Sequence, residues 1–146
     1  MQDRSPEVFH PVTQDKFGTP NGNCYSACVG SLVGLSMEEL RPFEALYRTL
    51  AVSYFDLEKY PELQKKLWAY GWGVLLQWIE KNAGFELVVG PAPAGQLYIA
   101  TGLSPRGPFN HSVIYRDQEL VWDPHPDRTG LVVKYDDQAE YVRRIK

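Results

Sequence analysis

Helical and strand-like sequence patterns occupy different parts of this chain of 146 residues. Between residues 24 and 83 the apolar residues mostly recur at helical spacing. After residue 84, short runs of Val, Ile, Leu and Tyr alternate with clusters of Gly, Pro, Asn and Asp. A parallel sheet requires strands and helices to alternate along the chain, which this order does not provide. We therefore predict an α+β fold in which an N-terminal helical layer packs on a C-terminal antiparallel sheet.

The first predicted helix spans residues 24–33, where small and apolar residues on nearly every face are typical of a helix buried in a core. Asn23 is its expected N-cap, and Gly34 is expected to end it. Ser36 and Glu39 form a capping-box pattern, which predicts another helix start. Further helices are predicted at 37–40, 43–57, 61–70 and 74–81, with Gly71 and Gly73 interrupting the last two.

The second half of the chain is predicted to form the sheet. Its strand candidates are residues 85–89, 97–101, 111–115, 119–122 and 131–135. Residues 116–118 are few enough to form a hairpin loop. Residues 1–20 are rich in Pro, Gly, Asn and Asp, so we expect an irregular N-terminal arm that ends in a turn at 20–22.

Length and composition limit the classes of protein that the chain can belong to. We expect a single domain over residues 1–146, because this length can bury most of its apolar surface around one core. A net charge of −3 lacks the basic footprint of a nucleic-acid or anionic-membrane binder, so neither partner is expected. No apolar run approaches the roughly 20 residues of a membrane helix, and the N-terminus lacks a secretory signal pattern. We expect a cytoplasmic protein with two free thiols.

Cys24 is the first candidate for a catalytic role. It opens the predicted buried helix, where unpaired backbone amides and the helix dipole favour the thiolate, the reactive form of cysteine. The alternative is that Cys24 is a small buried hydrophobe, as many free cysteines are. Cys28 lies one turn further from the positive end of the helix and is expected to pack without reacting.

His111 is the candidate base for Cys24. A cysteine nucleophile needs a base within hydrogen-bond reach and a third group that orients the base. His111 begins one predicted strand and Asp123 ends the next, so a hairpin would bring the two side chains together. A histidine at a strand end is by itself more often a surface or core residue. The combination with Cys24 and Asp123 is what predicts catalysis.

Three short segments resemble the motifs of papain-like cysteine peptidases. They are Gly-Asn-Cys-Tyr-Ser-Ala-Cys at 22–28, His-Ser-Val-Ile-Tyr at 111–115 and Val-Trp-Asp-Pro at 121–124. In this order they are similar to the compact bacterial and phage branch of that superfamily, which includes the double-glycine leader peptidases that process bacteriocins. The resemblance implies a papain-like fold and a triad of Cys24, His111 and Asp123.

The resemblance and the flanking loops suggest further site residues. In that family a glutamine upstream of the cysteine donates to the oxyanion hole, and Gln14 is the matching candidate. A glycine often follows the nucleophile there; this chain has Tyr25, which implies a narrower cleft or a different substrate. Arg106 and His125 lie in loops that flank the His and Asp motifs, so we expect them at the rim of the cleft. Arg106 would bind a carboxylate or phosphate there, or else be a solvated turn residue.

The predicted function is acyl transfer by a thiol hydrolase that acts on a peptide or a small amide and needs no cofactor. The sequence does not indicate the oligomeric state. One alternative is a zinc protein, because Cys24, Cys28, His111 and His125 are of the types that bind zinc. Another is a non-catalytic binding module on the same fold, since four Trp and nine Tyr can line a groove. We expect Trp68, Trp72 and Trp78 to pack within helices.

Overall fold

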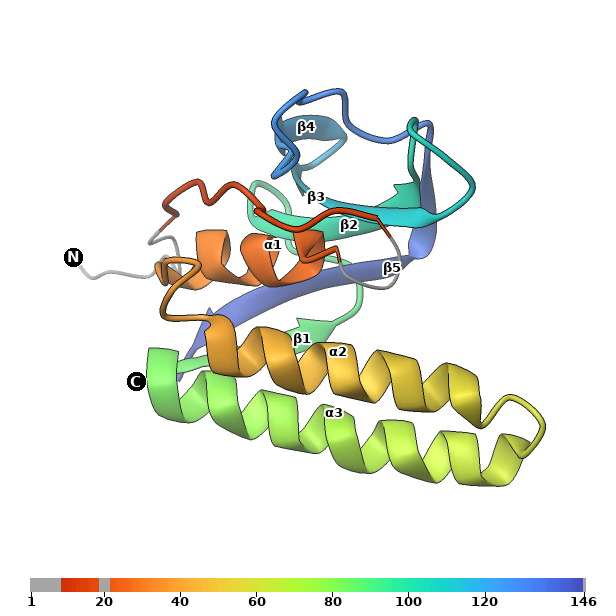
Figure 1. Cartoon of the computed structure of the whole chain (residues 1–146). Helices are drawn as coiled ribbons and strands as arrows, with labels where there is room; N and C mark the ends of the chain where they lie inside the picture. Colours follow the sequence, from red (N-terminus) through yellow and green to blue (C-terminus); the bar gives the residue numbers. More distant parts are fainter. Residues whose placement is uncertain (1–8, 19–21, 146) are drawn as a thin grey trace.

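A computed structural model describes residues 9–18 and 22–145 of the chain (Figure 1). Three helices come first, α1 (Cys24–Val33), α2 (Arg41–Asp56) and α3 (Pro61–Ala83). Five strands follow, β1 (Phe85–Val89), β2 (Leu97–Leu103), β3 (Asn110–Arg116), β4 (Glu119–Trp122) and β5 (Val133–Arg144). The helices pack on one antiparallel sheet, so the predicted α+β class is confirmed.

The sheet has the strand order β1-β5-β2-β3-β4, and every neighbouring pair is antiparallel. The last strand of the chain therefore lies in the interior of the sheet, between β1 and β2. The sequence prediction for β5 was wrong in extent, because the strand continues nine residues beyond Tyr135, to Arg144. Asp136, Asp137 and Gln138 are exposed and carry no strand pattern. The register with β2 shifts between Lys134 and Ala139, so these three residues lie in an irregularity of the strand. Pairing with β1 and β2, which sequence periodicity does not report, holds residues 139–144 in the sheet.

Helix α1 is buried between the sheet and the other two helices (Figure 1). Every residue from Tyr25 to Val33 is buried, which explains the lack of a polar face in its sequence. The helix ends as predicted at Gly34, whose φ of 80° is in the left-handed region that favours glycine. The main core combines residues of all three helices and the sheet, among them Val29, Leu32, Phe43, Ile79, Phe85, Ile99 and Ile114.

The predicted short helix at 37–40 is wrong, because these residues form a turn. The capping box itself is present: the backbone N–H of Ser36 donates to Glu39 Oε1 at 2.9 Å, and the N–H of Glu39 donates to Ser36 Oγ at 3.2 Å. Helix α2 starts immediately afterwards at Arg41, with Pro42 in its first turn, where a missing N–H costs nothing. The capping pattern therefore precedes α2 and does not open a separate short helix.

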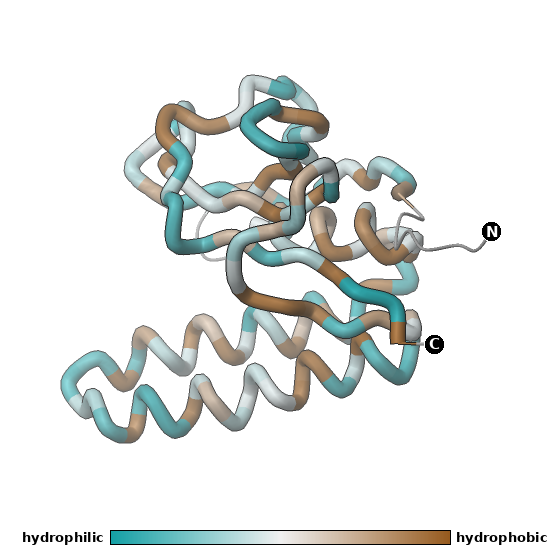
Figure 2. Tube along the Cα trace, turned by 180° about the vertical axis from the view of Figure 1, so that it is seen from behind, coloured by the Kyte–Doolittle hydropathy of each residue, from teal (hydrophilic) through white to brown (hydrophobic). Residues whose placement is uncertain are grey.

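The predicted interruption of the third helix is also wrong, because α3 continues through Gly71 and Gly73. Gly71 faces α2, and a Cβ placed there would lie 2.5 Å from Leu50 Cδ1. This glycine therefore permits close approach of two helices and does not break one. Figure 2 shows that the tip of the α2–α3 hairpin is mostly hydrophilic, whereas α1 is mostly hydrophobic. No helix in the described ranges has the length and apolarity needed to cross a membrane.

Candidate active site

Cys24 is the first residue of α1 and is partly exposed. Asn23 occupies the N-cap position as predicted, but its side chain makes no cap hydrogen bond. Instead, Asn23 Oδ1 accepts hydrogen bonds from the backbone N–H groups of Asp15 and Lys16, at 3.1 and 3.0 Å. Because the helix lacks a side-chain cap, the backbone amides of its first turn are available to an anion at Cys24.

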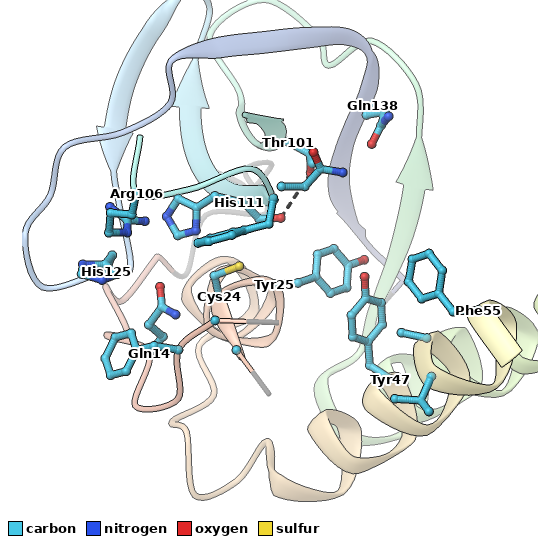
Figure 3. A pocket seen from close by; sticks show the side chains of 18 of the residues that line it. Gln14, Cys24, Tyr25, Tyr47, Phe55, Thr101, Arg106, His111, His125 and Gln138 are labelled. Atoms are coloured by element: carbon cyan, nitrogen blue, oxygen red, sulfur yellow. Dashed lines mark hydrogen bonds between the residues drawn. The ribbon is translucent and has the colours of Figure 1, made fainter. Parts of the chain in front are cut away.

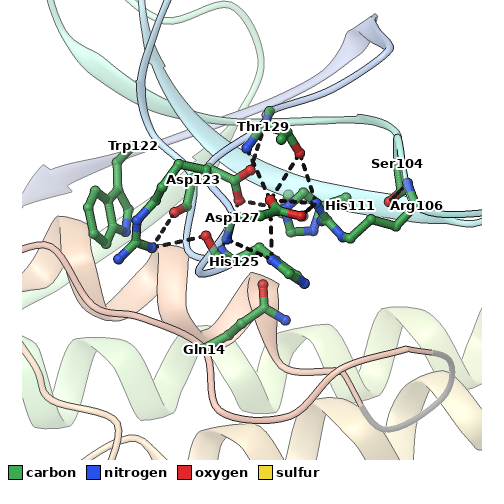
Figure 4. A network of polar contacts seen from close by, with 12 residues as sticks. Gln14, Ser104, Arg106, His111, Trp122, Asp123, His125, Asp127 and Thr129 are labelled. Atoms are coloured by element: carbon green, nitrogen blue, oxygen red, sulfur yellow. Dashed lines mark hydrogen bonds and ion pairs between the residues drawn. The ribbon is translucent and has the colours of Figure 1, made fainter.

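His111 and Asp123 are brought together by the β3–β4 hairpin. His111 is the second residue of β3, and Asp123 directly follows β4. His111 Nε2 lies 2.7 Å from Asp123 Oδ1, and both residues are almost fully buried, with 3% and 2% exposure. Asp123 also accepts backbone hydrogen bonds from His125 at 2.9 Å and from Gly130 at 2.7 Å (Figure 4). These contacts fix the carboxylate and, through it, the imidazole ring.

The electrostatics of this pair favour its ionised form. Burial alone lowers the pKa of His111, but hydrogen bonds and charges from Asp123 and Cys24 outweigh burial and raise the pKa to about 9. Burial raises the pKa of Asp123, yet hydrogen bonds from His111 and from two backbone amides hold it below its usual value. Since Asp123 occupies Nε2, the other ring nitrogen, Nδ1, remains for the Cys24 thiol.

The described part of the N-terminal arm, residues 9–18, contains no helix or strand, as predicted. Hydrogen bonds nevertheless hold it against the folded body. The His10 N–H donates to the carbonyl of Ser31 at 3.0 Å, and the Trp122 indole N–H donates to the carbonyl of Val12 at 3.0 Å. The remainder of the predicted arm, 1–8 and 19–20, lies outside the described residues, as does most of the predicted turn at 20–22.

The arm places Gln14 beside the site. Gln14 is 4% exposed, and its backbone N–H donates to the carbonyl of Pro124 at 3.0 Å, one residue after Asp123. Its side-chain Nε2 donates to the carbonyl of Lys16 at 2.8 Å. Gln14 Oε1 is buried without a hydrogen-bond partner among the described residues. The amide group is therefore held in one orientation with part of its hydrogen-bonding capacity unused.

These residues share one pocket with a volume of about 810 Å³. All seven residues that the sequence suggested as site residues except Asp123 line it, namely Gln14, Cys24, Tyr25, Arg106, His111 and His125. Asp123 does not line the pocket and is hydrogen-bonded to His111. Figure 3 shows Cys24 between His111 on one side and Tyr25 and Tyr47 on the other. The pocket therefore extends to both sides of the thiol.

Arg106 and His125 lie on the His111 side of the pocket (Figure 3). Arg106 Nη1 donates to both carboxylate oxygens of Asp127, at 2.9 and 3.0 Å, and to Thr129 Oγ1 at 3.1 Å. The His125 ring accepts at Nδ1 from the backbone N–H of Asp127, at 3.1 Å. Burial and the charge of Arg106 lower the pKa of His125. Both residues thus have structural partners in the loop after β4, and Arg106 is not the freely solvated turn residue of the alternative.

The other side of the pocket contains Tyr25, which the sequence analysis suggested, together with Tyr47 and Glu140, which it did not identify. Tyr25 is buried, and its hydroxyl donates a short hydrogen bond to Glu140 on β5. The Tyr47 ring stacks on Tyr25 at a centroid distance of 4.7 Å. Trp68 and Trp72 pack against the main core, as expected, but they are only partly buried and also line the pocket. Glu140 lies in the part of β5 that the sequence prediction missed. A prediction that extended this strand beyond Tyr135 would have included Glu140.

The zinc alternative depended on Cys28 and two histidines. Cys28 is fully buried in the main core, and burial raises the pKa of its thiol well above the usual value. The described residues contain no group of three or more His, Cys, Asp or Glu side chains placed to hold a metal ion.

Comparisons with family models, with curated proteins and with solved structures find no match to this chain. The geometry of the site is therefore the basis for a functional assignment.

Proposed function

We propose that this chain is a papain-like thiol hydrolase that cleaves a peptide or a small amide through Cys24, His111 and Asp123. One observation carries the proposal: His111 is bonded through Nε2 to a buried carboxylate, while a partly exposed thiol at a helix N-terminus interacts with the same ring. A nucleophile, a base and a group that orients the base are the parts that covalent catalysis by cysteine requires.

In the proposed reaction, His111 takes the proton of the Cys24 thiol, and the ionised Asp123 stabilises the resulting imidazolium. The thiolate sulfur attacks the carbonyl carbon of the scissile amide, and its oxygen gains the negative charge. Collapse of this intermediate expels the amine, which takes the proton from His111. Water, deprotonated in turn by His111, then attacks the thioester and releases the carboxylic acid and the free thiol.

The oxyanion would lie at the N-terminus of α1, where the backbone N–H of Cys24 is available. Gln14 supplies the second donor in this proposal. Its Nε2 carries two hydrogens, and the hydrogen bond to the carbonyl of Lys16 uses one of them. The other is left for the substrate oxygen. The backbone hydrogen bond from Gln14 to Pro124 supports this role, since it ties the donor to the loop that carries Asp123.

The arrangement of the layers supports the papain-like assignment. The proposed nucleophile begins a buried helix, α1, that packs against the sheet carrying the proposed base. Residues 24 and 111 are far apart in sequence, and the contact between α1 and β3 brings them together. No cofactor enters the proposed chemistry, because a thiolate and an imidazole supply both the nucleophile and the proton transfer.

Selective alkylation tests the proposal without a known substrate. The native protein is treated with iodoacetamide across a range of pH, together with Cys24→Ala, Cys28→Ala and His111→Ala variants, and the modified residue is located by mass spectrometry. We expect Cys24 to react rapidly near pH 6, where an ordinary thiol of pKa about 8.5 is less than about 1% thiolate. The His111→Ala variant should lose this reactivity at low pH.

His10→Ala provides the matched control, because His10 is exposed and does not line the pocket. It should react as the native protein does. If Cys24 is inert, or titrates like an ordinary thiol whether or not His111 is present, the hydrolase proposal fails. The pocket would then be better explained as a binding site without catalysis.

A further inference from the structure

The side of the pocket away from His111 contains an acidic group, Glu140, that has no basic partner in the part of the chain that the structure describes. Glu140 lines the pocket from β5 and accepts a hydrogen bond from the Tyr25 hydroxyl. Among the described residues it forms no ion pair, and the basic side chains lining the pocket, Arg106, His111 and His125, all lie on the opposite side (Figure 3). A half-buried carboxylate that lacks a counter-ion is unfavourable unless a ligand supplies one.

The desolvation of this carboxyl group is substantial. Burial raises the pKa of Glu140, and the hydrogen bond from Tyr25 offsets only part of that effect. The strand geometry explains the position: Glu140 pairs with Val89 of β1 and Ile99 of β2, so its backbone is in the interior of the sheet. Its side chain therefore starts from a rigid element and reaches the pocket in a defined place.

Aromatic rings surround the approach to Glu140. Tyr25 stacks on Tyr47 at 4.7 Å between centroids, Tyr25 lies 6.4 Å from Trp72, and Trp72 stacks on Trp68 at 5.9 Å. The faces of such rings attract cations, and their apolar surface accommodates methylene groups. A carboxylate next to several aromatic rings is a typical environment for the binding of an ammonium group on an alkyl chain.

We propose that this side of the pocket is a subsite for an alkylammonium group such as the end of a lysine side chain, with Glu140 as its counter-ion and Tyr25, Tyr47, Trp68 and Trp72 as its walls. That the ammonium group belongs to a substrate of Cys24 rests on the proposed function; the binding of the group does not. A substrate seated in this way carries its positive charge on the side of the scissile bond that faces α2 and α3.

Two small amides of equal length test the subsite. N-acetylcadaverine ends in an ammonium group, whereas N-hexylacetamide ends in a methyl group at the same position. Each is added to the full-length protein at about pH 8, where both an alkylamine and a carboxylate are charged. The rate at which iodoacetamide modifies Cys24 is followed by mass spectrometry. We expect N-acetylcadaverine to protect Cys24 at a concentration about tenfold lower than its uncharged analogue.

Glu140→Gln should abolish this preference, because it keeps an acceptor for Tyr25 while removing the charge. Glu86→Gln is the matched control: Glu86 is a partly exposed carboxylate paired with Arg143, and it does not line the pocket. It should retain the preference. Circular dichroism of each variant verifies that the protein is folded.

Three results would each overturn the subsite. The two amides could protect Cys24 equally, neither could protect it, or the Glu140→Gln variant could keep the preference of the native protein. The assay is independent of the proposed function, since an ordinary exposed thiol also reacts with iodoacetamide at this pH. The hydrolase proposal fails in a different experiment, namely if the rate of Cys24 alkylation near pH 6 does not depend on His111. The two failures are therefore distinguishable.

Discussion

His111 and Asp123 are twelve positions apart in the sequence and are joined side chain to side chain, at 2.7 Å, in the interior of the protein. The hairpin that connects them has only a short turn, residues 117–118, so little freedom remains in their relative position. A buried pair of this kind contributes to stability as well as to the proposed chemistry, and the two contributions have different pH dependence.

The first prediction concerns the pH dependence of stability. The pKa of His111 is about 9 in the folded protein, above the value of about 6.5 expected after unfolding. Its charged form is therefore favoured by folding. This contribution is complete below about pH 6.5 and is lost as the pH rises through 9; it amounts to no more than about 3 kcal/mol. Urea unfolding of the native protein and of His111→Gln should reveal a difference that decreases over this interval.

A constant difference between the two proteins from pH 6 to about 9.5 would contradict this expectation. His10→Gln is the control for the replacement of a histidine as such, because the His10 side chain is exposed. At acidic pH we expect a separate loss of stability, which comes from Asp123. The pKa of Asp123 is lowered in the folded protein, so its contribution is present above about pH 3.8 and disappears as the pH falls further.

The second prediction separates the proposed oxyanion donor, Gln14, from the proposed nucleophile, Cys24. Replacement of Gln14 by Ala should slow acylation of Cys24 by p-nitrophenyl acetate by about 100-fold, because the oxyanion loses a donor. Alkylation by iodoacetamide generates no oxyanion, so its rate near pH 6 should change little. The measurement compares the two rates in the same variant, with Gln118→Ala, an exposed loop residue, as control. An equal effect on both reactions would mean that Gln14 acts on the thiol or on the fold.

The third prediction uses two glycines that lie two residues apart in α3. A Cβ at Gly73 meets nothing within 4 Å, so Gly73→Ala should stabilise the protein by about 0.5–1 kcal/mol through helix propensity. A Cβ at Gly71 would meet the buried side chain of Leu50, so Gly71→Ala should destabilise the protein by about 1 kcal/mol. Unfolding in urea measures both. Equal stabilisation by both substitutions would show that α2 and α3 are not packed closely at Leu50.

The sequence was most informative where a local signal coincides with the end of an element. Gly34 ends α1 where it was predicted to, and the strands at 85–89 and 119–122 have the predicted bounds. The sequence predictions were wrong where packing between elements determines the local structure. Gly71 was interpreted as a helix breaker because a sequence does not show that another helix needs the space of its missing side chain.

In the candidate site, too, residues with a local sequence signal were identified, and a residue placed by tertiary packing was missed. Cys24, His111 and Asp123 were identified because each stands at the boundary of an element with a local pattern. Glu140 was not, because it lies in a stretch of β5 whose exposed acidic neighbours do not resemble an interior strand. Its position in the pocket is set by pairing with β1 and β2, which requires the folded sheet.

The interior position of β5 also determines the order in which the protein can be completed during synthesis. β1 pairs only with β5, so a nascent chain that has not yet released residues 133–144 from the ribosome has a gap in the middle of its sheet. Cys24, His111 and Asp123 all precede β5 in the chain, whereas Glu140 lies within it. Contacts between segments that are distant in the sequence slow folding. A ribosome that stalls before this strand therefore holds a chain that contains the three proposed catalytic residues but lacks the strand that carries Glu140.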